Sequence, residues 1–162
     1  MDTPVPAGTQ VPRPSYRSFL RVALVDDHAL VRAALRMVLD GTPGLQVCAE
    51  AQDGPSGVRT VLDERPDVTL MDLAMPGFGG VEATRAILAD WPQARVVVLT
   101  AFADEALMSE AVAAGAVGYV LKDAHPGTVV DAVREAALGG RPGARPDPAD
   151  AGPPVRGAAP AR

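Results

Sequence analysis

Residues 68–77 read VTLMDLAMPG, a mostly apolar run with one acidic side chain near its middle. The run has the character of a buried strand up to Asp72, and Met75, Pro76 and Gly77 then break the chain direction. A carboxylate at the end of such a strand is partly removed from water, which is unfavourable unless another group compensates its charge. Asp72 is therefore a candidate functional residue.

Apolar runs of strand length recur along the chain and alternate with segments whose apolar residues have helical spacing. Val and Leu dominate these runs with little polar alternation, which is typical of strands covered on both faces in a parallel sheet. Five strand–helix units predict an α/β fold, a doubly wound domain around a five-stranded parallel sheet. The predicted strands are 21–26, 45–51, 67–71, 94–100 and 117–121, and the predicted helices are 28–39, 56–64, 80–90, 104–114 and 127–138.

The composition limits the class of protein. A chain of 162 residues with 48% hydrophobic and 22% charged residues supports one globular domain with tails. The net charge of −5 argues against a nucleic-acid or anionic-membrane surface. A single cysteine excludes an internal disulfide framework, and no apolar stretch approaches the ~18 residues of a membrane span. We expect a cytoplasmic protein, because the N-terminus also lacks the layout of a secretory signal.

Both ends of the chain differ from its middle. Residues 1–19 contain four prolines and few large apolar groups, and residues 139–162 read GGRPGARPDPADAGPPVRGAAPAR. Such segments bury too little apolar surface to offset the entropy of ordering them. We expect a flexible N-terminal extension over 1–19, a folded domain over 20–138 and a disordered tail over 139–162.

Polar side chains stand at the ends of four predicted strands: Asp26 and Asp27, Asp72, Thr100, and Lys122. In doubly wound folds ligands bind beyond the carboxyl ends of the strands, so these groups converge on one edge of the sheet. Clustered carboxylates repel each other and suit a hard cation such as Mg²⁺. With a lysine and a hydroxyl beside them they can hold a transferring phosphoryl group, and Asp72 is the natural nucleophile.

Taken singly, each of these residues also has an ordinary structural explanation. An aspartate after a strand is usually a turn or cap residue, and an acidic pair before a helix often caps it. A lysine is mostly solvated, and a threonine fills strands readily. The occurrence of all of them at strand ends, in this order, favours a functional site.

Four motifs in order, VALVDDHALVRAAL, LMDLAMPG, VVVLTAF and GYVLKDA, resemble those of response-regulator receiver domains, and the resemblance covers residues 20–138. The Asp26-Asp27-His28 opening and the Lys122-Asp123 pair are most similar to receivers of LuxR/NarL-type transcription regulators. The resemblance implies a flavodoxin-like sheet with strand order 2-1-3-4-5. It also implies a two-component signalling domain that promotes only its own phosphorylation and dephosphorylation and is not otherwise an enzyme.

The same resemblance assigns roles to the site residues. It implies that a sensor histidine kinase phosphorylates Asp72, and that Asp72 also belongs to a Mg²⁺ site. Asp27 would bind the metal directly and Asp26 largely through water, and the backbone carbonyl of Ala74 would complete the protein ligands.

Three further residues follow from the family pattern. Lys122 would pair with the phosphoryl group, Thr100 would move toward it, and Tyr119 would turn inward as the aromatic partner of this switch. Tyr119 also has a simpler explanation, as a strand residue with a hydrated hydroxyl group.

The chain departs from the family pattern near the site. Gly79 stands where an acidic or amide residue is usual, which predicts a looser loop after Asp72. Ala74 and Phe102 are apolar at positions that are often polar, which predicts a long-lived phosphoryl group. His28 is expected to begin the first helix without contacting the site.

The expected output is a protein-interaction surface formed by helix 104–114, strand 117–121 and helix 127–138, through which phosphorylation drives homodimerisation. These helices have more apolar residues than one buried stripe needs: Leu107, Met108, Val112, Val129, Val130 and Val133.

No helix-turn-helix pattern follows Leu138, so we expect no DNA binding by this chain alone and no membrane partner. A stand-alone receiver and a truncated regulator both remain open. A receiver-like module that is not phosphorylated is an alternative function. A haloacid-dehalogenase-like phosphohydrolase is a weaker one, because the Asp-x-Asp that such enzymes carry after their first strand is missing.

Overall fold

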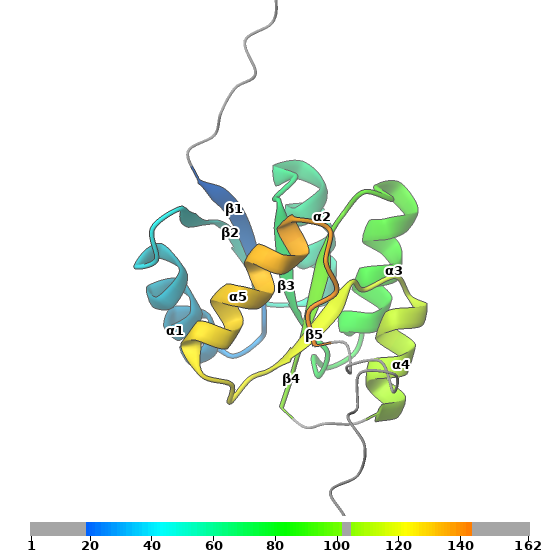
Figure 1. Cartoon of the computed structure of the whole chain (residues 1–162). Helices are drawn as coiled ribbons and strands as arrows, with labels where there is room; N and C mark the ends of the chain where they lie inside the picture. Colours follow the sequence, from blue (N-terminus) through cyan, green and yellow to red (C-terminus); the bar gives the residue numbers. More distant parts are fainter. Residues whose placement is uncertain (1–18, 102–104, 144–162) are drawn as a thin grey trace, which may run out of the picture.

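The protein is described by a computed structural model over residues 19–101 and 105–143. Its five strands form one parallel sheet in the order β2-β1-β3-β4-β5, which confirms the predicted fold and strand order (Figure 1). The strands are β1 (Leu20–Val25), β2 (Leu45–Ala51), β3 (Val68–Asp72), β4 (Val96–Thr100) and β5 (Gly118–Leu121). The helices are α1 (Ala29–Asp40), α2 (Gly54–Glu64), α3 (Gly80–Asp90), α4 (Glu105–Ala113) and α5 (Pro126–Ala137).

Helices cover both faces of the sheet. α1 and α5 lie on one face and α2, α3 and α4 on the other (Figure 1). Alternate residues of a strand point to opposite faces, so Leu70 packs with α1 and α5 while Met71 packs with α2 and α3. Every residue of β3 and β4 is buried, as expected of central strands in a parallel sheet.

The observed elements begin and end within two residues of the predicted ones. α2 begins two residues early because the side chain of Asp53 accepts a hydrogen bond from the Ser56 N–H at 2.8 Å and so caps the helix. Pro55 in the first turn is compatible with this start, because its missing N–H has no role there. The predicted start of the fourth helix, at 104, lies outside the described residues.

The apolar excess predicted on the last two helices is largely core. Val129, Val130 and Val133 are buried, because α5 packs against the sheet beside α1. Leu107 and Met108 of α4 are half-buried. Only Val112 among the six predicted residues is exposed, so the expected apolar partner face is smaller than the sequence suggests.

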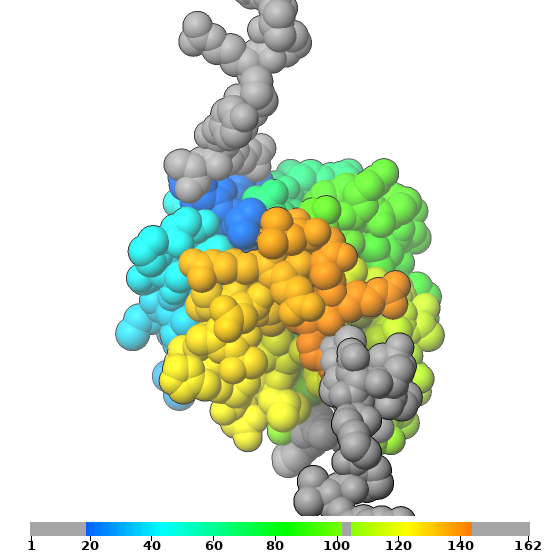
Figure 2. Space-filling view, viewed as in Figure 1, coloured from blue at the N-terminus to red at the C-terminus, as the bar shows by residue number. Residues whose placement is uncertain are grey.

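The chain continues beyond α5 along the sheet. Residues 139–143, which the sequence analysis assigned to the tail, turn back beside the edge strand β5 (orange in Figures 1 and 2). The N–H of Tyr119 donates a hydrogen bond to the Pro142 carbonyl at 3.1 Å, and Pro142 is buried. The first part of the predicted tail therefore contacts the folded domain.

None of the helices within residues 19–101 and 105–143 is long and apolar enough to cross a membrane.

Candidate functional site

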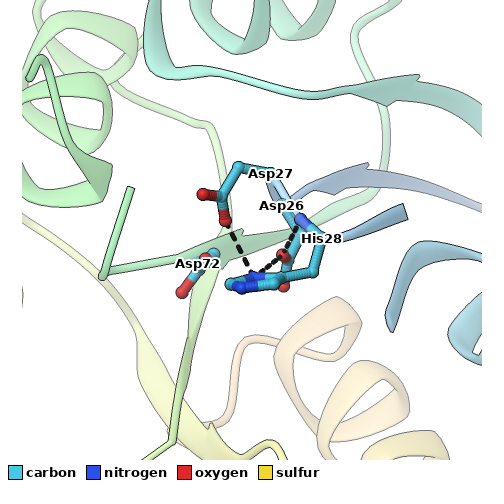
Figure 3. Close-up of side chains that lie close together, drawn as sticks. All are labelled: Asp26, Asp27, His28 and Asp72. Carbon is cyan, nitrogen blue, oxygen red and sulfur yellow. Dashed lines mark hydrogen bonds and ion pairs between the residues drawn. The ribbon is translucent and has the colours of Figure 1, made fainter. Parts of the chain in front are cut away.

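The acidic and basic residues predicted for the site follow the carboxyl ends of neighbouring parallel strands. Asp72 ends β3, Asp26 follows β1, and Lys122 follows β5. Since these strands run in one direction in the sheet, the three side chains meet at one edge. The close-up in Figure 3 shows Asp72 facing the pair Asp26 and Asp27.

Lys122 bridges two buried carboxylates. Its Nζ lies 2.8 Å from Asp26 Oδ2 and 3.0 Å from Asp72 Oδ2, and both aspartates have 0% of their surface exposed. Apart from this ammonium group, neither oxygen has a hydrogen-bond partner among the described residues. Two buried anions thus share one cation, which leaves the site with negative charge that a second cation would neutralise.

Burial and pairing shift two pKa values in this site. Desolvation raises the pKa of Asp72, and it outweighs the hydrogen bond from the Ala74 N–H and the contact with Lys122. Desolvation alone would lower the pKa of Lys122, but its contacts with Asp26 and Asp72 together raise that pKa. Lys122 is therefore a fixed positive charge, whereas burial makes the ionised form of Asp72 energetically unfavourable.

The loop after β3 holds Asp72 in place. Its Oδ1 accepts a hydrogen bond from the Ala74 N–H at 3.0 Å. The N–H of Gly79 donates to Glu82 Oε2 at 3.1 Å, which ties the loop to the first turn of α3. A Cβ on Gly80 would overlap the carbonyl oxygen of Asp72, so only glycine lets α3 begin this close to the strand end.

His28 contacts the acidic pair, and the expectation that it does not was wrong. Its Nδ1 lies 2.9 Å from Asp27 Oδ1 and 3.2 Å from Asp26 Oδ1 (Figure 3). The backbone N–H of His28 also donates to Asp26 Oδ1 at 2.8 Å. As predicted it stands at the start of α1, and its extended backbone there turns the ring back over the carboxylates.

The two predicted switch residues, Thr100 and Tyr119, lie on the strands β4 and β5. Thr100 is buried at the end of β4, and its carbonyl oxygen accepts the Lys122 N–H at 2.8 Å. Tyr119 lies one strand further out, half-buried against the core on the α3–α4 side of the sheet. Phe102, the other predicted influence on the phosphoryl group, lies outside the described residues.

The three carboxylates fit a hard divalent cation, which prefers oxygen ligands to the ring nitrogen of His28. Asp26, Asp27, His28 and Asp72 each offer an atom within 4.8 Å of the others. Opposite ligands of Mg²⁺ at its usual bond length are about 4.2 Å apart, so small side-chain movements suffice. Among the described residues, the buried Oδ2 atoms of Asp26 and Asp72 contact only the Lys122 ammonium group, so an ion bound beside them would offset the remaining negative charge of these carboxylates.

A parallel sheet in the order 2-1-3-4-5 with acidic residues and a lysine at one edge defines a receiver-type α/β domain. The response regulator receiver domain profile matches residues 22–134, and the chain belongs to this family.

Curated relatives include the transcriptional regulatory protein LiaR of Bacillus subtilis (strain 168), which is 41% identical over 120 residues. The response regulator UvrY of Escherichia coli (strain K12) is 41% identical over 122 residues. These alignments cover 74% and 75% of this chain but only 57% and 56% of the relatives, so the chain spans little more than half of their length.

Solved structures give the same picture. A LuxR-family two-component response regulator from Aurantimonas sp. SI85-9A1 superposes with a TM-score of 0.73 at 40% identity, covering 76% of this chain and 89% of that one. The receiver domain of the response regulator NarL from Mycobacterium tuberculosis superposes with a TM-score of 0.71 at 32% identity. This match covers 75% of this chain and 98% of that one. The chain is thus a response-regulator receiver domain of the LuxR/NarL type.

Proposed function

We propose that Asp72 accepts a phosphoryl group from a sensor histidine kinase and that this modification switches a protein-interaction surface. Family membership supports the reaction, and the ion pairs of Lys122 with Asp26 and Asp72 support the choice of residue. The contact between Lys122 and buried Asp72 is the observation that carries the proposal most strongly.

In the transfer step, a carboxylate oxygen of Asp72 attacks the phosphorus of a phosphohistidine. The new O–P bond forms as the N–P bond breaks, and the electron pair of that bond returns to the imidazole nitrogen. The Ala74 N–H orients the nucleophile through Oδ1, and Lys122 offsets charge beside it. Asp26, Asp27 and Asp72, with the Ala74 carbonyl, would hold Mg²⁺, which when bound neutralises charge on the transferring phosphoryl group.

The switch follows from the added charge. Phosphorylation brings about −1.5 to −2 charges to the site, and the Thr100 hydroxyl donates to the new oxygens. We propose that the loop after β4 then shifts, that Tyr119 turns inward, and that the surface formed by α4, β5 and α5 becomes the homodimer interface. Moving the active state from 1% to 99% needs about 5.5 kcal/mol, which a few charge-assisted hydrogen bonds can supply.

Acetyl phosphate with Mg²⁺, followed by intact mass, tests the phosphoacceptor. We expect the wild type to gain the mass of one phosphoryl group, and Asp72→Asn to gain none. Asp90→Asn, at the exposed end of α3, is the matched control and should behave as wild type. No gain in the wild type supports the non-phosphorylated module instead, and sustained phosphate release supports a hydrolase.

Analytical ultracentrifugation with and without beryllofluoride tests the switch. We expect the beryllofluoride-treated protein to sediment as a dimer at concentrations where the untreated protein is a monomer. Identical sedimentation in both states would contradict the proposed homodimerisation without affecting phosphoryl transfer.

A further inference from the structure

Residues 139–143 form a strap, named here the C-terminal strap, along the outer edge of β5 (orange in Figure 1). The chain reverses after α5 at Gly139, whose φ is +86°, and the Gly140 N–H donates to the Glu135 carbonyl at 2.8 Å. The Tyr119 N–H then donates to the Pro142 carbonyl at 3.1 Å. The strap therefore satisfies a backbone group that an edge strand otherwise leaves open to another chain.

The fit between strap and strand depends on two glycines, one on each side. A Cβ on Gly118 would overlap the carbonyl oxygen of Pro142, and a Cβ on Gly143 would overlap the carbonyl oxygen of Tyr119. Gly143 also has a φ of +73°, which side-chain-bearing residues rarely adopt. Pro142 itself is buried. This close approach of two backbones makes the strap a specific contact.

The strap also lies beside the ring of Tyr119, the predicted switch residue. A Cβ on Gly143 would lie 3.2 Å from Cδ1 and from Cε1 of the Tyr119 ring. A groove of about 320 Å³ is lined by Tyr119, Pro142 and Gly143 together with Asp131 and Glu135 of α5. The strap thus covers the Gly118–Tyr119 part of β5, the middle element of the α4–β5–α5 surface.

We propose that the C-terminal strap is an intramolecular competitor of homodimerisation: it occupies the β5 edge, and a second copy of this chain must displace it. The inference rests on the proposed dimer surface and adds a regulatory segment to it. Because the strap is hydrogen-bonded to the Tyr119 backbone and lies beside its ring, we expect a turn of that ring to weaken the strap. By linkage, loss of the strap in turn favours the dimer-competent state.

Two substitutions release the strap from opposite sides. Gly143→Ala acts from the strap and Gly118→Ala from the strand, since each adds a Cβ that overlaps the facing backbone. The matched control is Gly44→Ala, because Gly44 has a similar φ of +83° but nothing within 4 Å of the added Cβ. All three are made in the full chain, and thermal unfolding confirms that each variant is folded.

Two measurements decide the inference. Hydrogen exchange reports the Tyr119 amide, which we expect to be protected in the wild type and in Gly44→Ala and to exchange faster in both release variants. Sedimentation over a concentration series, with and without beryllofluoride, reports self-association. We expect about tenfold tighter dimerisation in both release variants, since displacement no longer breaks the strap's contacts.

Three other outcomes are possible, and each contradicts one part of the proposals. An unprotected Tyr119 amide in the wild type would show that the strap is not formed in solution. A released amide with unchanged or weaker dimerisation would show that the strap does not compete. If acetyl phosphate fails to modify Asp72 while the release variants still dimerise more tightly, the phosphoacceptor proposal fails and the strap inference stands.

Discussion

Burial of Asp72 affects both the pKa of its carboxyl group and the stability of the folded protein. Desolvation raises the pKa of this carboxyl above its ordinary value of 3.8. A raised folded-state pKa means that the group contributes stability below pH 3.8 and that this contribution is lost as the pH rises through the folded-state pKa. At neutral pH the ionised side chain therefore destabilises the metal-free protein.

Asp72→Asn is accordingly expected to raise the melting temperature at pH 7 in EDTA, by about 2–4 °C. The difference should shrink as the pH falls through the raised folded-state pKa of Asp72, because the wild-type carboxyl is then protonated. Differential scanning calorimetry across this pH range measures it, with Asp90→Asn as an exposed control. A lower melting temperature for Asp72→Asn would mean that the ion pair with Lys122 outweighs the burial of charge.

Gly80 has no room for a side chain, because its backbone lies against that of Asp72. Gly80→Ala places a Cβ against the carbonyl oxygen of Asp72, and overpacking of this kind costs about 1–3 kcal/mol. Gly79→Ala is the natural comparison, because its φ is −87° and its nearest contacts would be 3.2–3.4 Å. Urea unfolding should show a clear loss of unfolding free energy for Gly80→Ala and a much smaller loss for Gly79→Ala. Equal losses would contradict this distinction.

Ala74 tests the predicted long phosphoryl lifetime. Ala74 is exposed, and its N–H donates a hydrogen bond to Asp72, the proposed phosphoacceptor. Ala74→Asn supplies a group that can orient an attacking water, so the aspartyl phosphate should decay about tenfold faster. Intact mass after removal of acetyl phosphate follows the decay. Complete loss from the wild type within a few seconds would contradict the prediction.

At the scale of helices, α2 shows how one exposed side chain positions an element. Hydrogen bonding to the Ser56 N–H, together with a contact to the Ser56 hydroxyl, lowers the pKa of Asp53 below 3.8. A lowered pKa contributes stability above the ordinary value, and that contribution is lost as the pH falls through the folded-state pKa. Asp53→Ala should thus lower the melting temperature at pH 7 but not at the acid end.

Asp63→Ala is the control for this cap, because Asp63 is an exposed acid near the other end of α2. Circular dichroism melts at two pH values compare the variants. A pH-independent effect of Asp53→Ala would assign its role to something other than the ionised cap.

The elements themselves were largely predictable, because their signals are local. Apolar runs such as 94–100 and the helical spacing of 80–90 located the strands and helices, and the order of the sheet followed from the resemblance to receivers. The errors lie where tertiary contacts decide. The valines of α5 are core because α5 lies beside α1, and the tail contacts β5 through two glycines whose spacing carries no periodic pattern.

The site was predictable to a similar degree. Convergence of Asp26, Asp72 and Lys122 followed from their places after parallel strands. The contact of the His28 ring with the acidic pair could not be predicted, because the direction of the ring depends on the backbone angles at the start of α1. The one sequence signal for it was its place directly after the acidic pair.

At the scale of the whole molecule, we expect the acidic site to couple the stability of the fold to cation binding. A ligand that binds only the folded state stabilises it by about 2.7 kcal/mol at a hundred times its dissociation constant. Mg²⁺ should therefore raise the melting temperature in proportion to the logarithm of its concentration, because the buried carboxylates of Asp26 and Asp72 otherwise share one lysine.

Asp27→Asn tests this coupling with little disturbance of the fold, because Asp27 is partly exposed, at 29% of its side-chain surface, and outside the Lys122 contacts. We expect its melting temperature in EDTA to match that of the wild type, and most of the Mg²⁺-dependent rise to disappear. Asp90→Asn should keep the full rise. An equal Mg²⁺ response in Asp27→Asn and wild type would place the cation away from the acidic pair, and phosphoryl transfer to Asp72 would then need another source of charge neutralisation than these carboxylates provide.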